Sequence, residues 1–154
     1  MGKIEYKSNM DLNEKALISI VRTSELFKNR ISNLFKNYGL TFPQYNVLRI
    51  LEVSENGQDT ITNVSKILVV SGSNMTGVAK RLERGGFLIR KSDPNDERIT
   101  LLEITPKGRQ TLRNVAEEKD KILSRYLEDH TDEQKNGLLS SLNQIRSNAE
   151  SNIP

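Results

Sequence analysis

The chain has 154 residues, with 23 Lys or Arg against 20 Asp or Glu, and its formal net charge is only +3. This length predicts one domain, residues 1–154. The absence of cysteine and the single histidine, His130, exclude disulfides, thiolate metal sites and thiol catalysis. No cofactor is indicated. No stretch approaches about 18 consecutive apolar residues, so we expect no membrane partner and a cytoplasmic location.

The first half of the chain has a helical pattern. Apolar residues recur at steps of three and four from Leu12 to Tyr38, which predicts one long amphipathic helix that ends at Gly39. Thr41 and Gln44 then have the spacing of a capping box, which predicts a second, shorter helix. Residues 55–59 are expected to form the loop that stops this helix.

Two further short helices predict a helix-turn-helix. Thr60 or Thr62 can cap the first of them, and residues 69–73 break it. In the second, Met75, Val78 and Leu82 form the apolar side, and residues 85–86 are both glycine, which predicts a left-handed exit. A tight turn of small residues between two short helices is typical of a helix-turn-helix.

The second half combines a hairpin with two helices. The aliphatic runs 87–91 and 98–104 flank a polar turn, which predicts a β-hairpin, and behind a helix-turn-helix a hairpin is a wing. A cap at Thr105 predicts the next helix, to about Leu127, and a capping box from Thr131 begins the last one. The expected fold class is mainly α (α+β): a winged helix-turn-helix with a two-stranded β wing, flanked by long N- and C-terminal dimerisation helices.

The terminal helices predict a homodimer. Their apolar stripes are narrow, and no third layer is available to cover them, so pairing between two copies would bury them. We therefore assign residues 12–38 and 109–153 to dimerisation and residues 41–106 to a winged-helix DNA-binding region.

The positive charge is concentrated in one region. Residues 60–109 hold nine Lys or Arg against five Asp or Glu, an excess of four, whereas the rest of the chain holds 14 against 15. An excess over a helix-turn-helix and wing is typical of a nucleic-acid face, although a solvated cationic helix side would look similar.

The helix that begins near residue 72 is the candidate recognition helix. Its polar side has small residues first and cations later, which suits a helix whose amino end enters the major groove. Asn74 is the best candidate for base readout, and Gly77 would let the backbone approach DNA. Ser71 is either a helix cap or a phosphate contact. The predicted DNA contacts of the helix and wing are Ser71, Ser73, Asn74, Thr76, Gly77, Lys80, Arg81, Arg84, Arg90, Asp96 and Arg98.

Four motifs in order resemble the MarR family of winged-helix regulators: residues 40–44, 71–87, 90–98 and 102–108. The resemblance implies a sequence-specific transcriptional regulator, a ligand-responsive repressor, that acts as a homodimer on a pseudo-palindromic operator in double-stranded DNA. It implies no enzymatic activity. It also implies that Arg98 enters the minor groove at the wing tip while Asp96 orients the wing. The alternative for both is a surface ion pair that stiffens the turn.

The same resemblance implies a small aromatic or phenolic effector, held between the dimer region and the winged helix. Its binding would change the spacing of the two recognition helices. Arg22, Arg30, Tyr38 and Tyr45 lie on helices near the expected cleft. Core packing of the tyrosines and solvation of the arginines are the alternatives for these residues.

Two other functions stay open at this point. One is a winged-helix module that binds another protein or RNA without operator specificity, because a fold alone does not fix its partner. The other is a hydrolase in which Asp93, Asp96 and Glu97 hold a divalent cation, although no nucleophile or base converges on that turn.

Overall fold

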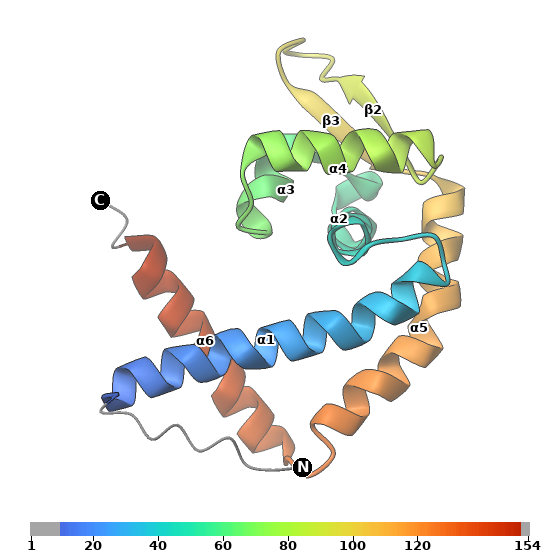
Figure 1. The fold of residues 1–154 in the computed structure, drawn as a ribbon. Coiled ribbons are helices and arrows are strands. Elements are labelled where there is room, and N and C mark those ends of the chain that lie inside the picture. The colour runs from blue at the N-terminus through green and yellow to red at the C-terminus, as the bar shows by residue number, and fades with distance from the viewer. Residues whose placement is uncertain (1–9, 152–154) are drawn as a thin grey trace. The chain divides into compact units, whose positions relative to one another are not determined.

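The structure is a computed structural model that describes residues 10–151 (Figure 1). The expected domain and its last helix extend beyond these residues at the two ends. The elements in order are α1 (Leu12–Lys36), α2 (Phe42–Val53), η1 (Glu55–Gly57), β1 (Gln58–Thr60), α3 (Ile61–Ile67), α4 (Gly72–Arg84), β2 (Leu88–Ser92), β3 (Thr100–Ile104), α5 (Pro106–Tyr126) and α6 (Asp132–Ser151). A helical chain with a small antiparallel sheet confirms the expected fold class.

The chain forms two compact units that divide within α5, after Ala116. The first unit contains all the elements from α1 to β3 and the first half of α5. Within residues 10–151, no helix combines the length and the apolar character that crossing a membrane would require.

The capping box predicted at the start of the second helix is present. The helix α1 ends at Lys36, two residues before Tyr38. At the start of α2, the Thr41 hydroxyl accepts a hydrogen bond from the Gln44 amide at 3.4 Å. The Gln44 side chain in turn accepts one from the Thr41 amide at 2.8 Å, which confirms the capping box.

The turn between α3 and α4 contains a residue in an unfavourable conformation. Of the two predicted caps of α3, Thr60 is the one present: its hydroxyl accepts from the Asn63 amide at 3.1 Å. After α3, the amides of Val69 and Val70 bond back to the carbonyls of Lys66 and Ser65, the pattern of a Schellman motif. Val69 has a φ of 53° at the position where this motif normally has glycine. A β-branched residue there is strained, because its Cβ crowds the backbone.

We expect Val69→Gly to stabilise the protein by about 1 kcal/mol, since it removes this strain. Little burial is lost with the side chain, which is 67% exposed. The measurement is the midpoint of urea unfolding at fixed protein concentration. Val70→Gly, at a neighbouring position without a positive φ, is the matched control and should lower stability. Equal losses in both variants would contradict the strain at Val69.

The sheet has one strand more than the sequence predicts. Its order is β1-β3-β2, and β3 pairs antiparallel with both neighbours. The hairpin of β2 and β3 is the predicted wing, and in Figure 1 its tip extends beyond α4. The extra strand, β1, lies in the segment expected to be only a loop. Its three residues are polar and have no strand pattern, and they become a strand because they pair with the edge of β3.

The core of the first unit lies between α2, α4 and the sheet. It contains Leu48 and Leu51 of α2, Leu82 of α4, and Leu102 of β3, all fully buried. The predicted left-handed exit from α4 is correct for Gly86, which has a φ of +74°, but not for Gly85, which has a φ of −75°. Gly85 is required for another reason: a Cβ there would lie 2.7 Å from the ring of Phe87.

The second unit contains the end of α5 and the helix α6. The capping box predicted from Thr131 is present: the Thr131 amide donates to the Gln134 side chain at 2.8 Å, and the Thr131 hydroxyl accepts from the Gln134 amide at 3.2 Å. No side chain of α6 is buried. Its apolar residues Leu138, Leu139, Leu142 and Ile145 are all exposed.

Candidate nucleic-acid interface

The helix α4 has one buried side and one exposed side, as the sequence predicts. Met75, Val78 and Leu82 are buried against the rest of the first unit. Ser73, Asn74, Lys80, Arg81 and Arg84 are exposed on the other side, and Thr76 and Gly77 are half-buried. The packing of the buried side therefore presents the polar side to solvent along the whole helix.

The amino end of α4 is capped by Ser71. Its hydroxyl accepts from the Asn74 amide at 3.4 Å and lies 3.3 Å from the Ser73 hydroxyl. The Thr76 hydroxyl donates to the Gly72 carbonyl at 2.9 Å. Ser71 thus has the capping role that was one of its two interpretations. A capped helix end of this kind also attracts phosphate, because its first amides and the helix dipole point outward.

Gly77 is not required by the packing of the chain itself. A Cβ built on it would have the Arg81 guanidinium as its nearest neighbour, 3.6 Å away, which is an ordinary contact. In mid-helix, alanine would be more favourable than glycine by about 1 kcal/mol. The missing side chain therefore leaves free space beside the half-buried backbone of Gly77.

The cations of α4 are available to an external partner. The side chains of Lys80, Arg81 and Arg84 form no hydrogen bond or ion pair with another residue in the described part of the chain. All three are exposed, on the half of the helix nearest its carboxyl end. This arrangement suits contacts to the phosphates that flank a groove.

Arg98 is held in place at the tip of the wing by Asp96. The Arg98 guanidinium donates two hydrogen bonds to the Asp96 carboxylate, through Nε and Nη2, each at 2.9 Å. The Arg98 backbone amide adds a third at 3.1 Å. The Arg98 side chain is nevertheless 90% exposed, while that of Asp96 is 33% exposed. The carboxylate thus orients a guanidinium that is otherwise surrounded by solvent.

The same contact fixes the charges of the pair. The side-chain hydrogen bonds from Arg98, followed by its backbone hydrogen bond, lower the pKa of Asp96 below its ordinary value. The side-chain contact raises the pKa of Arg98. Because the pKa of Asp96 is lowered, the stabilisation from this pair is present above the ordinary carboxyl pKa and is lost as the pH falls through the lowered value. Arg98 therefore stays charged and oriented at neutral pH.

Arg90, which the sequence predicts as a DNA contact, is bonded to another residue of the chain. Its Nε donates to the Glu83 carboxylate of α4 at 2.8 Å, and its backbone amide donates to the same group at 3.2 Å. The side-chain hydrogen bond lowers the pKa of Glu83 more than partial burial raises it. The pair joins α4 to β2, so Arg90 orients the wing relative to α4. Sequence reasoning missed Glu83, since no periodicity relates a helix residue to a strand residue across a turn.

Comparisons with known proteins decide the family. The sequence model of the MarR family matches residues 38–99. The HTH-type transcriptional regulator MhqR of Bacillus subtilis is 31% identical over 115 residues, which cover 71% of this chain and 77% of that protein. The chain belongs to the MarR family. The resemblance found in its motifs is thereby confirmed, and because the relatives of this MarR protein are transcriptional regulators, it is not an enzyme.

Two further comparisons extend this result. The transcriptional repressor MprA of Escherichia coli K12 is 34% identical over 92 residues. These residues cover 60% of this MarR protein and 52% of MprA. The crystal structure of Sco3205, a MarR family transcriptional regulator from Streptomyces coelicolor, was determined in complex with DNA. It superposes with a TM-score of 0.80 over 96% of this chain and 92% of Sco3205. At 20% identity, this likeness concerns the fold.

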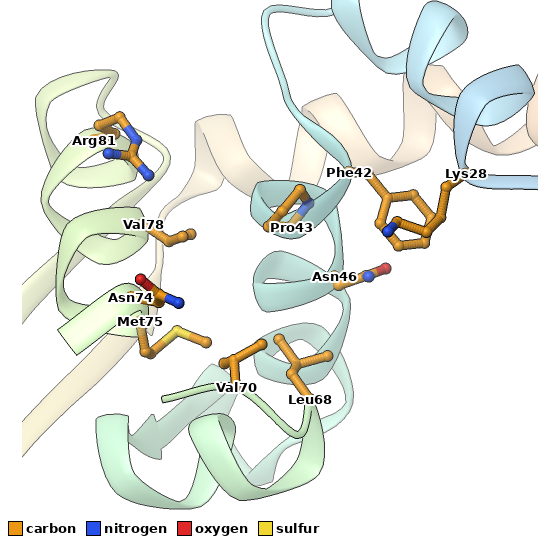
Figure 2. A pocket seen from close by; sticks show the side chains of 10 residues that line it. All are labelled: Lys28, Phe42, Pro43, Asn46, Leu68, Val70, Asn74, Met75, Val78 and Arg81. Carbon is orange, nitrogen blue, oxygen red and sulfur yellow. The ribbon is translucent and has the colours of Figure 1, made fainter. Parts of the chain in front are cut away.

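The four residues that the MarR resemblance suggested for an effector do not line the pocket between α2 and α4. Tyr45 is buried, and its ring stacks on that of Phe35 with centroids 4.0 Å apart, which agrees with the packing alternative. Tyr38 is half-buried, and Arg22 and Arg30 are exposed. A pocket of about 440 Å³ opens instead between α2 and α4, and none of these four residues lines it (Figure 2).

The acidic residues of the wing turn do not form a cation site. Within residues 10–151, no group of three or more His, Asp or Glu side chains is placed to hold a metal ion. The Asp96 carboxylate is bound by Arg98, and Asp93 accepts from the Asn95 amide at 2.7 Å. These carboxylates order the turn that carries Arg98.

Proposed function

We propose that this MarR-family protein binds double-stranded DNA with α4 and the wing and represses transcription from a pseudo-palindromic operator. The observation that carries the proposal is the exposed Arg98 guanidinium, fixed by Asp96 at the wing tip. An oriented cation of this kind suits a narrow minor groove, while the exposed side of α4 suits the neighbouring major groove. Acting on chromosomal DNA, the protein would work in the cytoplasm.

The roles of the individual residues follow from their positions. Ser73, Asn74 and Thr76 lie at the amino end of α4, where base edges are read, and Lys80, Arg81 and Arg84 would hold phosphates. Ser71 caps the amino end of α4, which would approach the phosphate backbone of the DNA. The proposal assigns Arg90 to orientation of the wing through Glu83. The structure of Sco3205 in complex with DNA supports the proposal through the shared fold.

A homodimer is part of the proposal. Large apolar side chains are exposed on α1 and α6, and Leu139 of α6 is 57% exposed. The others in these two helices are Leu12, Leu17, Val21, Leu26, Leu138, Leu142 and Ile145. Burying them against a second copy would give two recognition helices related by a two-fold axis, which suits half-sites about 34–36 Å apart. Sedimentation of the purified protein as a stable folded monomer would contradict this assembly.

An effector also stays part of the proposal. A small aromatic or phenolic molecule would release the operator by changing the spacing of the recognition helices. Arg22, Arg30 and Tyr38 remain candidates for a cleft formed in the dimer. The buried and stacked Tyr45 would act there only through its packing.

The direct test of DNA binding is selection of duplexes from a random pool. We expect the recovered sites to have two-fold symmetry and a fixed half-site spacing, because two identical α4 helices read them. Single-stranded RNA of matched length serves as the competitor. Recovery of unrelated sequences, or displacement by RNA at equal concentration, would favour the interaction module without operator specificity.

We expect Gly77→Ala to raise stability but to weaken operator binding. Alanine gains up to about 1 kcal/mol of helix propensity, and its Cβ meets only the flexible end of Arg81 inside the chain. On the DNA side, the same methyl group would keep the backbone from approaching. The measurements are urea unfolding and fluorescence anisotropy with a labelled operator. An increase in stability with unchanged affinity would remove Gly77 from the interface.

A further inference from the structure

The exit of α4 is bonded to the start of α5. The Thr105 hydroxyl donates to the Gly86 carbonyl at 2.7 Å, and the Lys107 ammonium donates to the Gly85 carbonyl at 2.6 Å. The Thr105 amide adds a third hydrogen bond, to the Phe87 carbonyl at 3.0 Å. Three consecutive carbonyls directly after α4 thus have partners in one short segment, which Figure 1 shows beside the end of that helix.

The Thr105 hydroxyl serves both helices at once. Its oxygen accepts from the Gly108 amide at 3.1 Å, which caps the amino end of α5, while its proton is donated to the Gly86 carbonyl. A hydroxyl can do both because it has one proton and two lone pairs. Valine has nearly the same shape and can do neither. The start of α5 and the exit of α4 therefore share one side-chain group.

The Lys107 side chain is a second attachment between the same two helices. Besides its bond to the Gly85 carbonyl, its Nζ lies 4.6 Å from the centre of the Phe87 ring, a distance at which a cation is attracted to the face of the ring. Lys107 is exposed, so its side chain adds little to the core. Its contacts hold α5 against the turn that leaves α4.

A third attachment joins the first turn of α5 to α2. The Arg109 guanidinium donates to the Glu52 carboxylate at 2.7 Å, and both side chains are partly buried. Farther along α5, Leu112 and Val115 are buried, but no side chain between residues 116 and 126 is. The direction of α5 relative to α4 is therefore fixed near its first turn.

This direction matters because α5 leads out of the first unit. The two units divide within α5, after Ala116, and α6 with its exposed apolar residues follows. In the proposed homodimer, two α4 helices read half-sites at a fixed separation. The angle between α4 and α5 affects that separation in each subunit. A rigid joint accepts one half-site spacing, whereas a loose joint accepts several.

We infer that Thr105 and Lys107 are positioning residues that select the half-site spacing of the operator by holding α4 at a fixed angle to α5. In this role neither residue contacts DNA, and both act through α4. The inference rests on the proposed DNA-binding homodimer. The wing is held to α4 separately, by the pair of Glu83 and Arg90, so contacts with a single half-site do not depend on the joint.

The first test measures the joint without DNA. The chain has no cysteine, so spin labels can be attached at Lys80→Cys on α4 and Arg113→Cys on α5, both exposed. Refolding with an excess of unlabelled protein limits the measured distances to those within one subunit. In double electron–electron resonance, we expect the distance distribution to be about twice as broad in Thr105→Val/Lys107→Met as in the labelled wild type.

A matched control makes the same two substitutions elsewhere in α5. In Thr111→Val/Lys121→Met, the lost contacts are those of the Thr111 hydroxyl with the Lys107 carbonyl and of the Lys121 ammonium with Glu117, all within the helix. The distribution should keep its wild-type width.

Circular dichroism would confirm that each variant is folded. If Thr105→Val/Lys107→Met loses its helical signal, Lys107→Met alone takes its place, since that side chain is exposed. A distribution as narrow as that of the wild type would overturn the joint.

The second test measures the choice of spacing on DNA, with operators in which the selected spacing is lengthened or shortened by one base pair. The wild type should bind them about tenfold more weakly than the selected operator, a loss like that of one mismatched base pair. For Thr105→Val/Lys107→Met, we expect a difference of only about threefold, because a looser α4 can follow the displaced half-site. Its affinity for a short duplex with a single half-site should equal that of the wild type.

The outcomes keep this inference apart from the function on which it rests. Tenfold discrimination that persists in Thr105→Val/Lys107→Met would overturn the inference. So would equal weakening on every duplex, the single half-site included, because a general loss of stability has that effect. Failure of the wild type to bind any duplex would overturn the proposed function, and the selection of spacing with it. The spin-label measurement would still decide whether the two residues hold α4 to α5.

Discussion

Arg98→Ala is expected to weaken operator binding about 10- to 100-fold. In the wild type, Asp96 has already oriented the guanidinium, so little conformational entropy would be lost on the proposed entry of Arg98 into a groove. The side chain is 90% exposed, so its removal disturbs little of the fold. The measurement is fluorescence anisotropy with the selected operator at several salt concentrations. The slope of log affinity against log salt should become less steep, because one cation no longer displaces counterions.

The companion variants separate orientation from charge. Asp96→Ala keeps the Arg98 charge but removes its three hydrogen bonds, so it should weaken binding less than Arg98→Ala and leave the salt slope nearly unchanged. Arg84→Ala should lower the slope by about one if this residue holds a phosphate. Arg113→Ala, on the exposed surface of α5, is the control and should have no effect. Unchanged affinity and slope in Arg98→Ala would refute the role of the wing tip.

The parts of the fold that could be predicted are those whose cause lies within a few residues. The capping boxes at Thr41 and Thr131 are local hydrogen-bond patterns, and the structure has both. The buried side of α4 follows from helical spacing alone, as Met75 and Leu82 confirm. Asp96 and Arg98 are two residues apart, so their contact is also local.

The features that could not be predicted depend on residues far apart in the chain. The strand β1 is polar and forms only because the edge of β3 is available to pair with it. Glu83 meets Arg90 because the turn after α4 folds the strand β2 back along the helix. The pocket combines α1, α2, α4 and the turn before α4, and no single segment has a pattern that reveals it. Such contacts require the packed structure.

Gly108→Ala is expected to destabilise the protein by about 2–3 kcal/mol, although alanine is the better helix former. Gly108 lies in the first turn of α5, where a Cβ would meet the Phe87 carbonyl oxygen and lie 2.7 Å from Cγ1 of Ile104. Neither neighbour can move easily. The Phe87 carbonyl already accepts a hydrogen bond from the Thr105 amide at 3.0 Å, and the Ile104 side chain is part of the core.

The size of this effect is tested by urea unfolding of Gly108→Ala beside Gly77→Ala, at one protein concentration. The same substitution is made in a helix in both, but Gly77 has space for a methyl group and Gly108 does not. We therefore expect shifts of opposite sign, with the midpoint lower for Gly108→Ala and higher for Gly77→Ala. A thermal midpoint for Gly108→Ala roughly 5–10 °C below that of the wild type would agree with the predicted free energy. A gain in stability in both variants would contradict close packing of the first turn of α5 on the Phe87 carbonyl. Helix propensity alone would then determine the effect of Gly108→Ala.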